Sequence, residues 1–285
     1  ESQMKRRVIV VGGGPAGMMS AITAAKEGAE VTILEHNDRI GKKILSTGNG
    51  RCNFTNEYQS PSEYRSDEQS FPWKVVSQFP YEETLRFFEE LGIMGKKKNG
   101  GLYPFSEQAS AVLDVLRMEV ERRRITVYTG VNVLEIKAVR NGFRVIAVSK
   151  EQGRKTFCGD ALILAAGSKA ASKLGSDGSG YSLAKSMGHS MIPVVPALVQ
   201  LECCENFYKA LAGARVYGKV MLLIDGKEAA TDTGEIQLTD YGISGIPVFQ
   251  VSRFAARGLY EKRRVKAVMD YMPDFSEKAF ADYIE

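Results

Sequence analysis

Three glycines and one acid carry the clearest chemical signal in this sequence. Gly12, Gly14 and Gly17 form a G-x-G-x-x-G pattern, and Glu35 lies 18 residues beyond Gly17. The first glycine of such a pattern permits a tight turn, the second lets the backbone approach a pyrophosphate, and the third lets a helix pack on a strand. The pyrophosphate lies at the helix N-terminus, and the acid meets ribose hydroxyls. We therefore predict a dinucleotide site formed by Gly12, Gly14, Ala16, Gly17 and Glu35.

The elements needed to position these residues are present around them. Residues 8–11 form a continuous β-branched run, typical of a strand buried on both faces. Residues 18–26 read as a helix, and residues 31–34 as a second strand that ends at Glu35. The alternative without a ligand is an ordinary βαβ unit with a glycine-rich turn. A signal peptide fits poorly, because Gly and Pro interrupt the apolar run and no clear cleavage pattern follows.

Composition excludes several other classes of protein. The 285 residues are 44% hydrophobic and 25% charged, an ordinary globular balance. A net charge of +4 without a basic stripe argues against a nucleic-acid partner. No apolar run could span a bilayer. Four cysteines without C-x-x-C spacing, and only two histidines, indicate a reduced, cytoplasmic protein with no metal site. We expect a small-molecule substrate, and the oligomeric state stays open.

A long polar loop follows the acid, over residues 36–56. Such loops are uncommon in compact domains unless they have a role, although a solvated connector is the alternative. Its stretch GKKILSTGNGRCNFTN resembles a loop in a bacterial family labelled BaiN-like, YhiN-like or aminoacetone-oxidase-like FAD-dependent oxidoreductases. The resemblance implies FAD rather than NAD as the tightly held cofactor, with NAD(P)H as a candidate electron donor. It also implies cofactor contacts from His36, Lys42, Lys43, Gly48, Arg51 and Asn53.

The predicted secondary structure of the later part of the chain indicates an inserted sheet and then a second domain. Residues 131–138, 143–149 and 155–158 alternate as three antiparallel strands, and residues 161–165 then form a buried strand ending before Gly167. This order resembles the two-dinucleotide-fold flavoproteins, which implies cofactor contacts at Gly167 and an adenine contact at Val131. We predict a doubly wound α/β, FAD-binding Rossmann-like domain with an inserted antiparallel sheet over residues 4–195. A partial, strand-rich substrate or cap domain would follow over residues 196–285.

Local signals predict three further features. Ser106 and Ser244 are candidate N-caps of helices over residues 107–123 and 248–257. The run Lys96–Lys98 reads as a solvated turn. The segment Gly175–Tyr181 resembles the G-S-x-G-x-G-Y segment of the same flavoprotein family, and the whole resemblance extends from residue 7 to about residue 272. Family members continue into a segment that closes over the flavin. Its motif is absent here, so we expect part of the protein to be missing from this sequence.

The resemblance implies an oxidoreductase in which FAD carries a hydride between NAD(P)H and an unidentified organic substrate. The residues themselves offer no triad, no paired carboxylates near the glycines and no activated thiol, so we predict no indispensable side-chain acid or base. Cys52, beside Arg51, is the nearest candidate, and a packing role is the simpler interpretation. Two alternatives from other classes stay open: a flavoprotein involved in RNA modification, and a non-catalytic FAD-binding module.

Overall fold

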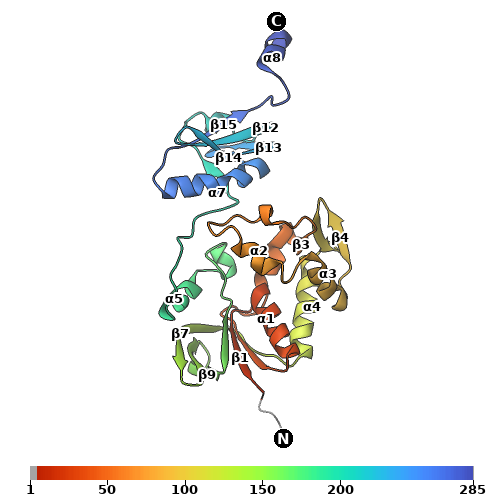
Figure 1. Ribbon diagram of the computed structural model, residues 1–285, viewed down its shortest axis with the longest axis vertical. Helices are drawn as coiled ribbons and strands as arrows, with labels where there is room; N and C mark the ends of the chain where they lie inside the picture. The colour runs from red at the N-terminus through yellow and green to blue at the C-terminus, as the bar shows by residue number, and fades with distance from the viewer. Residues whose placement is uncertain (1–4, 285) are drawn as a thin grey trace. The chain divides into compact units, whose positions relative to one another are not determined.

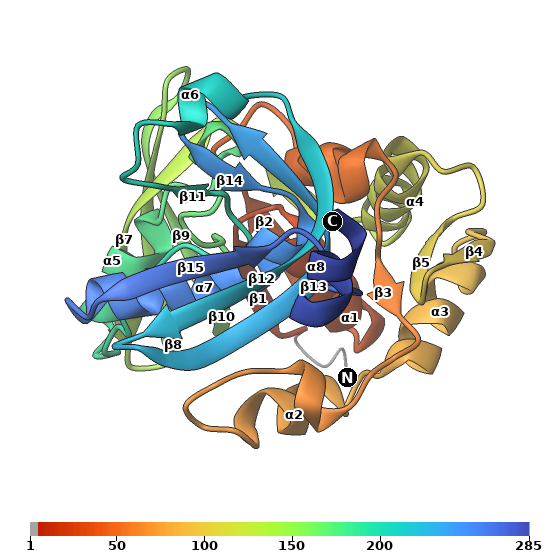
Figure 2. The same ribbon diagram turned by 90° about the horizontal axis from the view of Figure 1, so that it is seen from above.

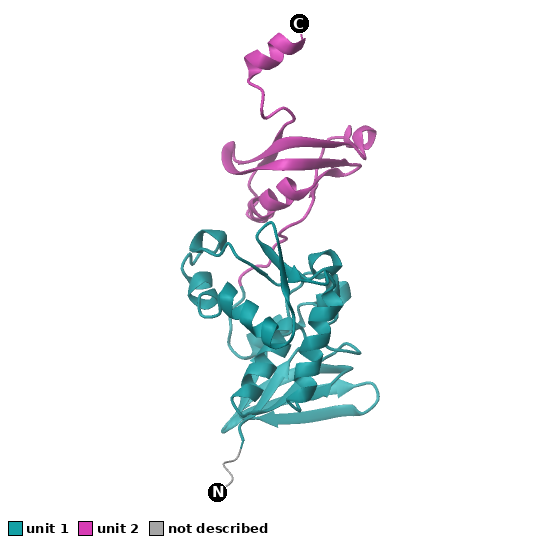
Figure 3. Cartoon of the chain, turned by 90° about the vertical axis from the view of Figure 1, so that its right-hand side faces the viewer, with its two compact units in different colours: residues 1–191 teal, residues 192–285 magenta. Residues whose placement is uncertain are grey.

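The computed structural model describes residues 5–284. The chain divides into two compact units, Glu1–Met191 and Ile192–Glu285, which Figure 3 colours separately. The glycine pattern, Glu35 and the polar loop all belong to the first unit. Each unit has its own apolar core, so the two are described in turn.

A parallel four-stranded sheet organises the first unit, with strand order β10-β1-β2-β6. Val8 pairs with Ala161 and Val31 on its two sides, so the strand that contains residues 161–164 lies next to the first strand in one parallel sheet. Residues 161–165 were predicted to form a buried strand, but all four residues of β10 are half-buried, because β10 lies at the sheet edge. The strands are β1 (Arg7–Val11), β2 (Glu30–Leu34), β6 (Thr126–Tyr128) and β10 (Ala161–Leu164).

Helix α1 packs against this sheet, and α4 lies beside α1 (Figure 1). Met18 and Ile22 of α1 meet Ile33 of β2 in the core, all three inaccessible to solvent. Burying each such side chain stabilises the fold by about 1.5–3 kcal/mol. The helices of this unit are α1 (Pro15–Lys26), α2 (Phe71–Val76), α3 (Tyr81–Glu90), α4 (Ala109–Arg122) and α5 (Ser179–Ser186), with 3-10 helices η1 (Lys42–Gly50), η2 (Pro61–Glu63) and η3 (Ser172–Leu174).

Two antiparallel sheets complete the first unit. β7 (Val131–Val139), β8 (Gly142–Ser149) and β9 (Gly153–Gly159) form the predicted inserted sheet. β3 (Thr55–Asn56), β4 (Gly95–Lys98) and β5 (Gly101–Pro104) form a second sheet that was not predicted. The run Lys96–Lys98 therefore lies in a strand rather than a turn, and it is exposed as expected.

The predicted N-cap at Ser106 is wrong. Glu107 adopts a left-handed conformation with φ +53°, which a helix cannot include, so α4 begins only at Ala109 with Gln108 as its N-cap. The helix is therefore two residues shorter at its start than the sequence suggested.

The second unit is an antiparallel sheet of order β11-β14-β13-β12-β15, with α7 packed on β13 and β12 (Figure 2). Ser244 ends β14 and is not an N-cap; Gly245, at φ +107°, precedes α7 because a Cβ there would overlap the carbonyl of Glu235. The elements are β11 (Leu201–Glu202), α6 (Tyr208–Leu211), β12 (Arg215–Ile224), β13 (Lys227–Thr239), β14 (Gly242–Ser244), α7 (Ile246–Tyr260), β15 (Val265–Asp270) and α8 (Glu277–Ile284). Across residues 5–284, every helix is too short or too polar to cross a lipid bilayer.

Candidate cofactor site

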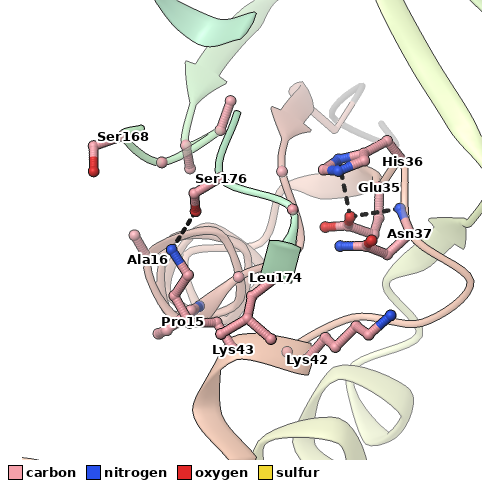
Figure 4. A pocket seen from close by; sticks show the side chains of 17 residues that line it. Pro15, Ala16, Glu35, His36, Asn37, Lys42, Lys43, Ser168, Leu174 and Ser176 are labelled. Atoms are coloured by element: carbon pink, nitrogen blue, oxygen red, sulfur yellow. Dashed lines mark hydrogen bonds and ion pairs between the residues drawn. The ribbon is translucent and has the colours of Figure 1, made fainter. Parts of the chain in front are cut away.

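A cavity of about 340 Å³ lies where three segments of the first unit meet. One wall is the glycine-rich turn before α1, the second is the end of β2 with the loop after it, and the third is the segment after β10 (Figure 4). The carboxyl ends of parallel strands converge here, which is where open α/β sheets bind ligands. Eight of the thirteen predicted cofactor residues line this cavity: Gly12, Gly14, Ala16, Glu35, His36, Lys42, Lys43 and Gly167.

The three motif glycines serve two different purposes. Gly12 has φ +103°, and a Cβ on it would overlap the Ala165 carbonyl, so this glycine lets β1 and β10 approach. A Cβ on Gly17 would overlap the Gly12 carbonyl, so it lets α1 close onto the turn. Gly14 is different, because nothing lies within 4 Å of where its Cβ would be. Gly14 therefore leaves room beside the N-terminus of α1, a position that suits a phosphate.

Glu35 lies in the wall formed by the end of β2 and the loop after it, and it is only 5% exposed. Its Oε2 accepts a hydrogen bond from the Gly13 N–H at 2.7 Å, and its Oε1 accepts one from the Asn37 N–H at 2.8 Å. His36 Nδ1 lies 3.3 Å from Oε1. Oε2 has one donor in the chain and keeps a further lone pair, so Glu35 can still accept a hydrogen bond from a ribose hydroxyl.

Two consecutive lysines at the start of η1 extend in different directions (Figure 4). The ammonium of Lys43 donates to the Ala170 carbonyl at 2.8 Å and to the hydroxyl of the buried Ser176. Lys42 lines the cavity and makes no ion pair within residues 5–284. The sequence did not identify Ser176 as a site residue, although the Gly175–Tyr181 resemblance passed directly over it.

Five of the predicted cofactor residues do not line the cavity: Gly17, Gly48, Arg51, Asn53 and Val131. Gly48, at φ +55°, packs against the Asn53 N–H, and Asn53 lies beside Gly101. Arg51 is exposed and lies 3.9 Å from Glu107. Val131 is buried and donates its N–H to the Glu35 carbonyl at 3.0 Å, so that N–H is already used. The cofactor roles of these residues stay predictions.

A second cavity of about 850 Å³ adjoins the first, and His36 lines both. Gly130 and Asn132, on either side of Val131, line its wall. The second cavity extends to Asn132 of β7 and to Val148 and Ser149 of β8. No group of three or more metal-ligating side chains gathers anywhere in the described residues.

A comparison with known families places residues 6–258 in one of them, described as the HI0933-like protein Rossmann domain. The chain belongs to the HI0933-like family. Among curated relatives, this HI0933-like chain is 47% identical to a 3-dehydro-bile acid delta(4,6)-reductase of Clostridium scindens, over 98% of the chain and 68% of that protein. It is 29% identical to a ribosomal RNA dihydrouridine synthase of Haemophilus influenzae, over 86% of the chain and 61% of that protein.

Among solved structures, a 3-ketosteroid-delta4-(5alpha)-dehydrogenase of Rhodococcus jostii has a TM-score of 0.53 at 13% identity, covering 80% of the HI0933-like chain and 62% of that structure. This last similarity concerns the fold alone. The family match and the relative from Clostridium scindens confirm the predicted family and the oxidoreductase class. The solved structure agrees with the predicted α/β fold class.

Proposed function

We propose that this chain forms the FAD-binding part of an oxidoreductase that reduces an organic small molecule at the expense of NAD(P)H. The observation that carries the proposal is the cavity in which the free side of Gly14, the N-terminus of α1 and the carboxylate of Glu35 converge. These are the groups that a diphosphate and an adjoining ribose require. The matching reductase supports the direction of the chemistry.

Each wall of the site would hold one part of the cofactor. The N-terminus of α1 and the ammonium of Lys42 would bind the pyrophosphate, and Glu35 would accept hydrogen bonds from the ribose. The adenine would lie toward the second cavity, beside His36 and the Gly130–Asn132 backbone. When bound, FAD supplies the hydride transfer, and the chain's own residues bind and orient it.

The substrate class we propose is a carbon–carbon double bond conjugated to a carbonyl. The name of the relative from Clostridium scindens describes reduction of such a system in a 3-keto bile acid. In the net reaction the far carbon of the double bond would gain a hydride that comes from NAD(P)H by way of FAD, and a proton from water would reach the carbon beside the carbonyl. The chain spans about two thirds of that relative, so this substrate is an inference from likeness.

The test is to purify the full-length protein that contains this chain, measure FAD release on denaturation, and follow NAD(P)H oxidation with and without a 3-keto-Δ4,6 steroid. We expect one FAD per chain and NAD(P)H oxidation that depends on the acceptor. A colourless protein that binds NADH stoichiometrically would overturn the proposal.

A second candidate is reduction of uridine in RNA, which the relative from Haemophilus influenzae favours. Uridine carries the same conjugated pattern, so the flavin chemistry would be unchanged. The mild net charge of +4 gives it less support than the small-molecule substrate. Loss of uridine and gain of dihydrouridine in ribosomal RNA incubated with enzyme and NAD(P)H, without turnover of the steroid, would favour this candidate.

A further inference from the structure

The segment Ser168–Ser176, here called the strap, forms one wall of the cavity. It follows β10 through Gly167, which adopts φ +78° and approaches Ser176 so closely that a Cβ would lie 2.9 Å from the serine hydroxyl. Most of the strap is exposed, but Ser176 is 8% exposed. Its conformation is irregular apart from the single turn η3. Such a segment needs contacts with other parts of the chain to keep one position.

Lys43 provides such a contact from the opposite wall (Figure 4). Its ammonium donates to the Ala170 carbonyl at 2.8 Å and to the Ser176 hydroxyl, which are 127 and 133 residues away in sequence. Both acceptors are uncharged, so the bonds hold the strap without neutralising the lysine's charge. The contact therefore fastens the strap and keeps a cation at the edge of the cavity.

The strap also meets the wall at the ribose end. Gly175 adopts φ +100°, and a Cβ there would lie 3.0 Å from His36 Nε2. The strap is thus in contact with η1 through Lys43 and with the end of β2 through Gly175. Movement of the strap away from Lys43 would open the cavity along this whole wall.

We infer that Lys43 is a positioning residue that holds the strap closed over the cofactor cavity, whereas its neighbour Lys42 acts on the ligand alone. The role of the cavity rests on the proposed function, but the fastening of the strap does not. Lys42 and Lys43 carry the same charge on adjacent residues and differ in their contacts, so they form a matched pair for testing.

The first measurement is amide hydrogen exchange of strap peptides without FAD. The N–H groups of Leu174 and Gly175 donate within the strap, at 2.9 and 3.0 Å, and serve as reporters. Losing a charge-assisted pair of bonds predicts about tenfold faster exchange in Lys43→Met. Lys42→Met should stay within about twofold of wild type, as should Lys173→Met, which removes an exposed charge from the strap itself.

Two further variants separate positioning from a general loss of stability. Lys43→Arg keeps N–H donors on a longer side chain, so exchange in this variant should be as slow as in the wild type. If exchange in Lys43→Met were fast only because the substitution disturbs packing, Lys43→Arg would not be slow. Ser176→Ala removes one acceptor and should speed exchange, and it should add little to Lys43→Met because both act on the same contact. If Lys43→Met does not fold, Ser176→Ala decides the question alone.

The second measurement is FAD affinity. Lys43→Met and Ser176→Ala should each weaken FAD binding and also speed strap exchange. Lys42→Met should weaken FAD binding and leave strap exchange unchanged. Strap exchange in Lys43→Met within twofold of wild type would overturn the inference, whatever happens to FAD affinity. Failure of the full-length wild type and of all its variants to bind FAD would overturn the proposed function, and the strap exchange rates could still be interpreted.

Discussion

The Oε2 atom of Glu35 accepts a hydrogen bond from the backbone N–H of Gly13 at 2.7 Å, across 22 residues of sequence. The acid at the end of β2 therefore holds the glycine turn in place as well as facing the cavity. Sequence motifs assign this acid to the ribose alone. In this fold it has a structural role before any ligand arrives, and that role gives it a measurable effect on stability.

We expect Glu35→Gln to destabilise the first unit without FAD by about 1–3 kcal/mol. The carboxylate faces two backbone donors, Gly13 and Asn37, so an amide must turn its NH₂ toward one of them and leave a buried donor unsatisfied. Urea unfolding measures the change. Glu30→Gln, on the exposed start of β2, is the control and should be neutral. Equal stability of both variants would show that the Glu35 bonds contribute nothing.

Alanine substitutions of Gly14 and Gly17 should have different effects, the first on FAD affinity and the second on stability. Gly14 has φ −74° and free space at its Cβ position, so Gly14→Ala should melt with the wild type but bind FAD more weakly, by about 5- to 150-fold if the added methyl costs 1–3 kcal/mol in the complex. Gly17→Ala should instead lower stability, because its Cβ would overlap the Gly12 carbonyl. Thermal unfolding and FAD titration check both. A Gly14→Ala chain with unchanged FAD affinity would place the pyrophosphate elsewhere.

The thiols should differ in reactivity. Cys158 and Cys204 are exposed, while Cys52 is buried, and burial raises the pKa of its thiol above the ordinary value. Because the thiolate is the reactive form, Cys52 should react with a disulfide reagent at pH 8 only after unfolding. Cys52→Ser should leave FAD binding and turnover within a few-fold. Fast labelling of Cys52 in the folded chain, or loss of turnover by orders of magnitude, would make it a functional thiol.

Tyr208 should make the second unit sensitive to alkali. The side chain is 4% exposed, and burial, followed by its hydrogen bond with Cys203, raises the pKa of Tyr208 above its ordinary value of 10.0. A raised folded-state pKa means that this contribution to stability is intact below pH 10 and is lost as the pH rises above it. Tyr208→Phe should therefore lose less stability than wild type between pH 9 and pH 11 in urea unfolding. Tyr217→Phe, on the exposed face of β12, should follow the wild type.

Periodicity predicted the parts of the fold that depend on local burial. The βαβ start, the inserted sheet and the late parallel strand follow from apolar patterns, and they were placed correctly. Ser106 was misread because an N-cap preference says nothing of the left-handed residue that follows it. The Lys43–Ser176 contact could not be predicted from the sequence, since no local pattern relates two side chains 133 residues apart. The sequence suggested which residues lie near a cofactor. It could not show which of them contact the cofactor and which instead hold another segment of the protein in position.

The pairing of β1 with β10 has a consequence for how the protein is made. Arg7 and Asp160, whose contact begins this pairing, are 153 residues apart. At ~5–20 residues per second, the ribosome needs roughly 8–30 s to deliver β10 after β1. β2 follows soon after β1 and pairs with one side of it, so the other side of β1 waits with its backbone groups free. During that interval the nascent chain exposes an unpaired, hydrophobic strand edge. Such an edge can be bound by a chaperone or can pair with a wrong strand.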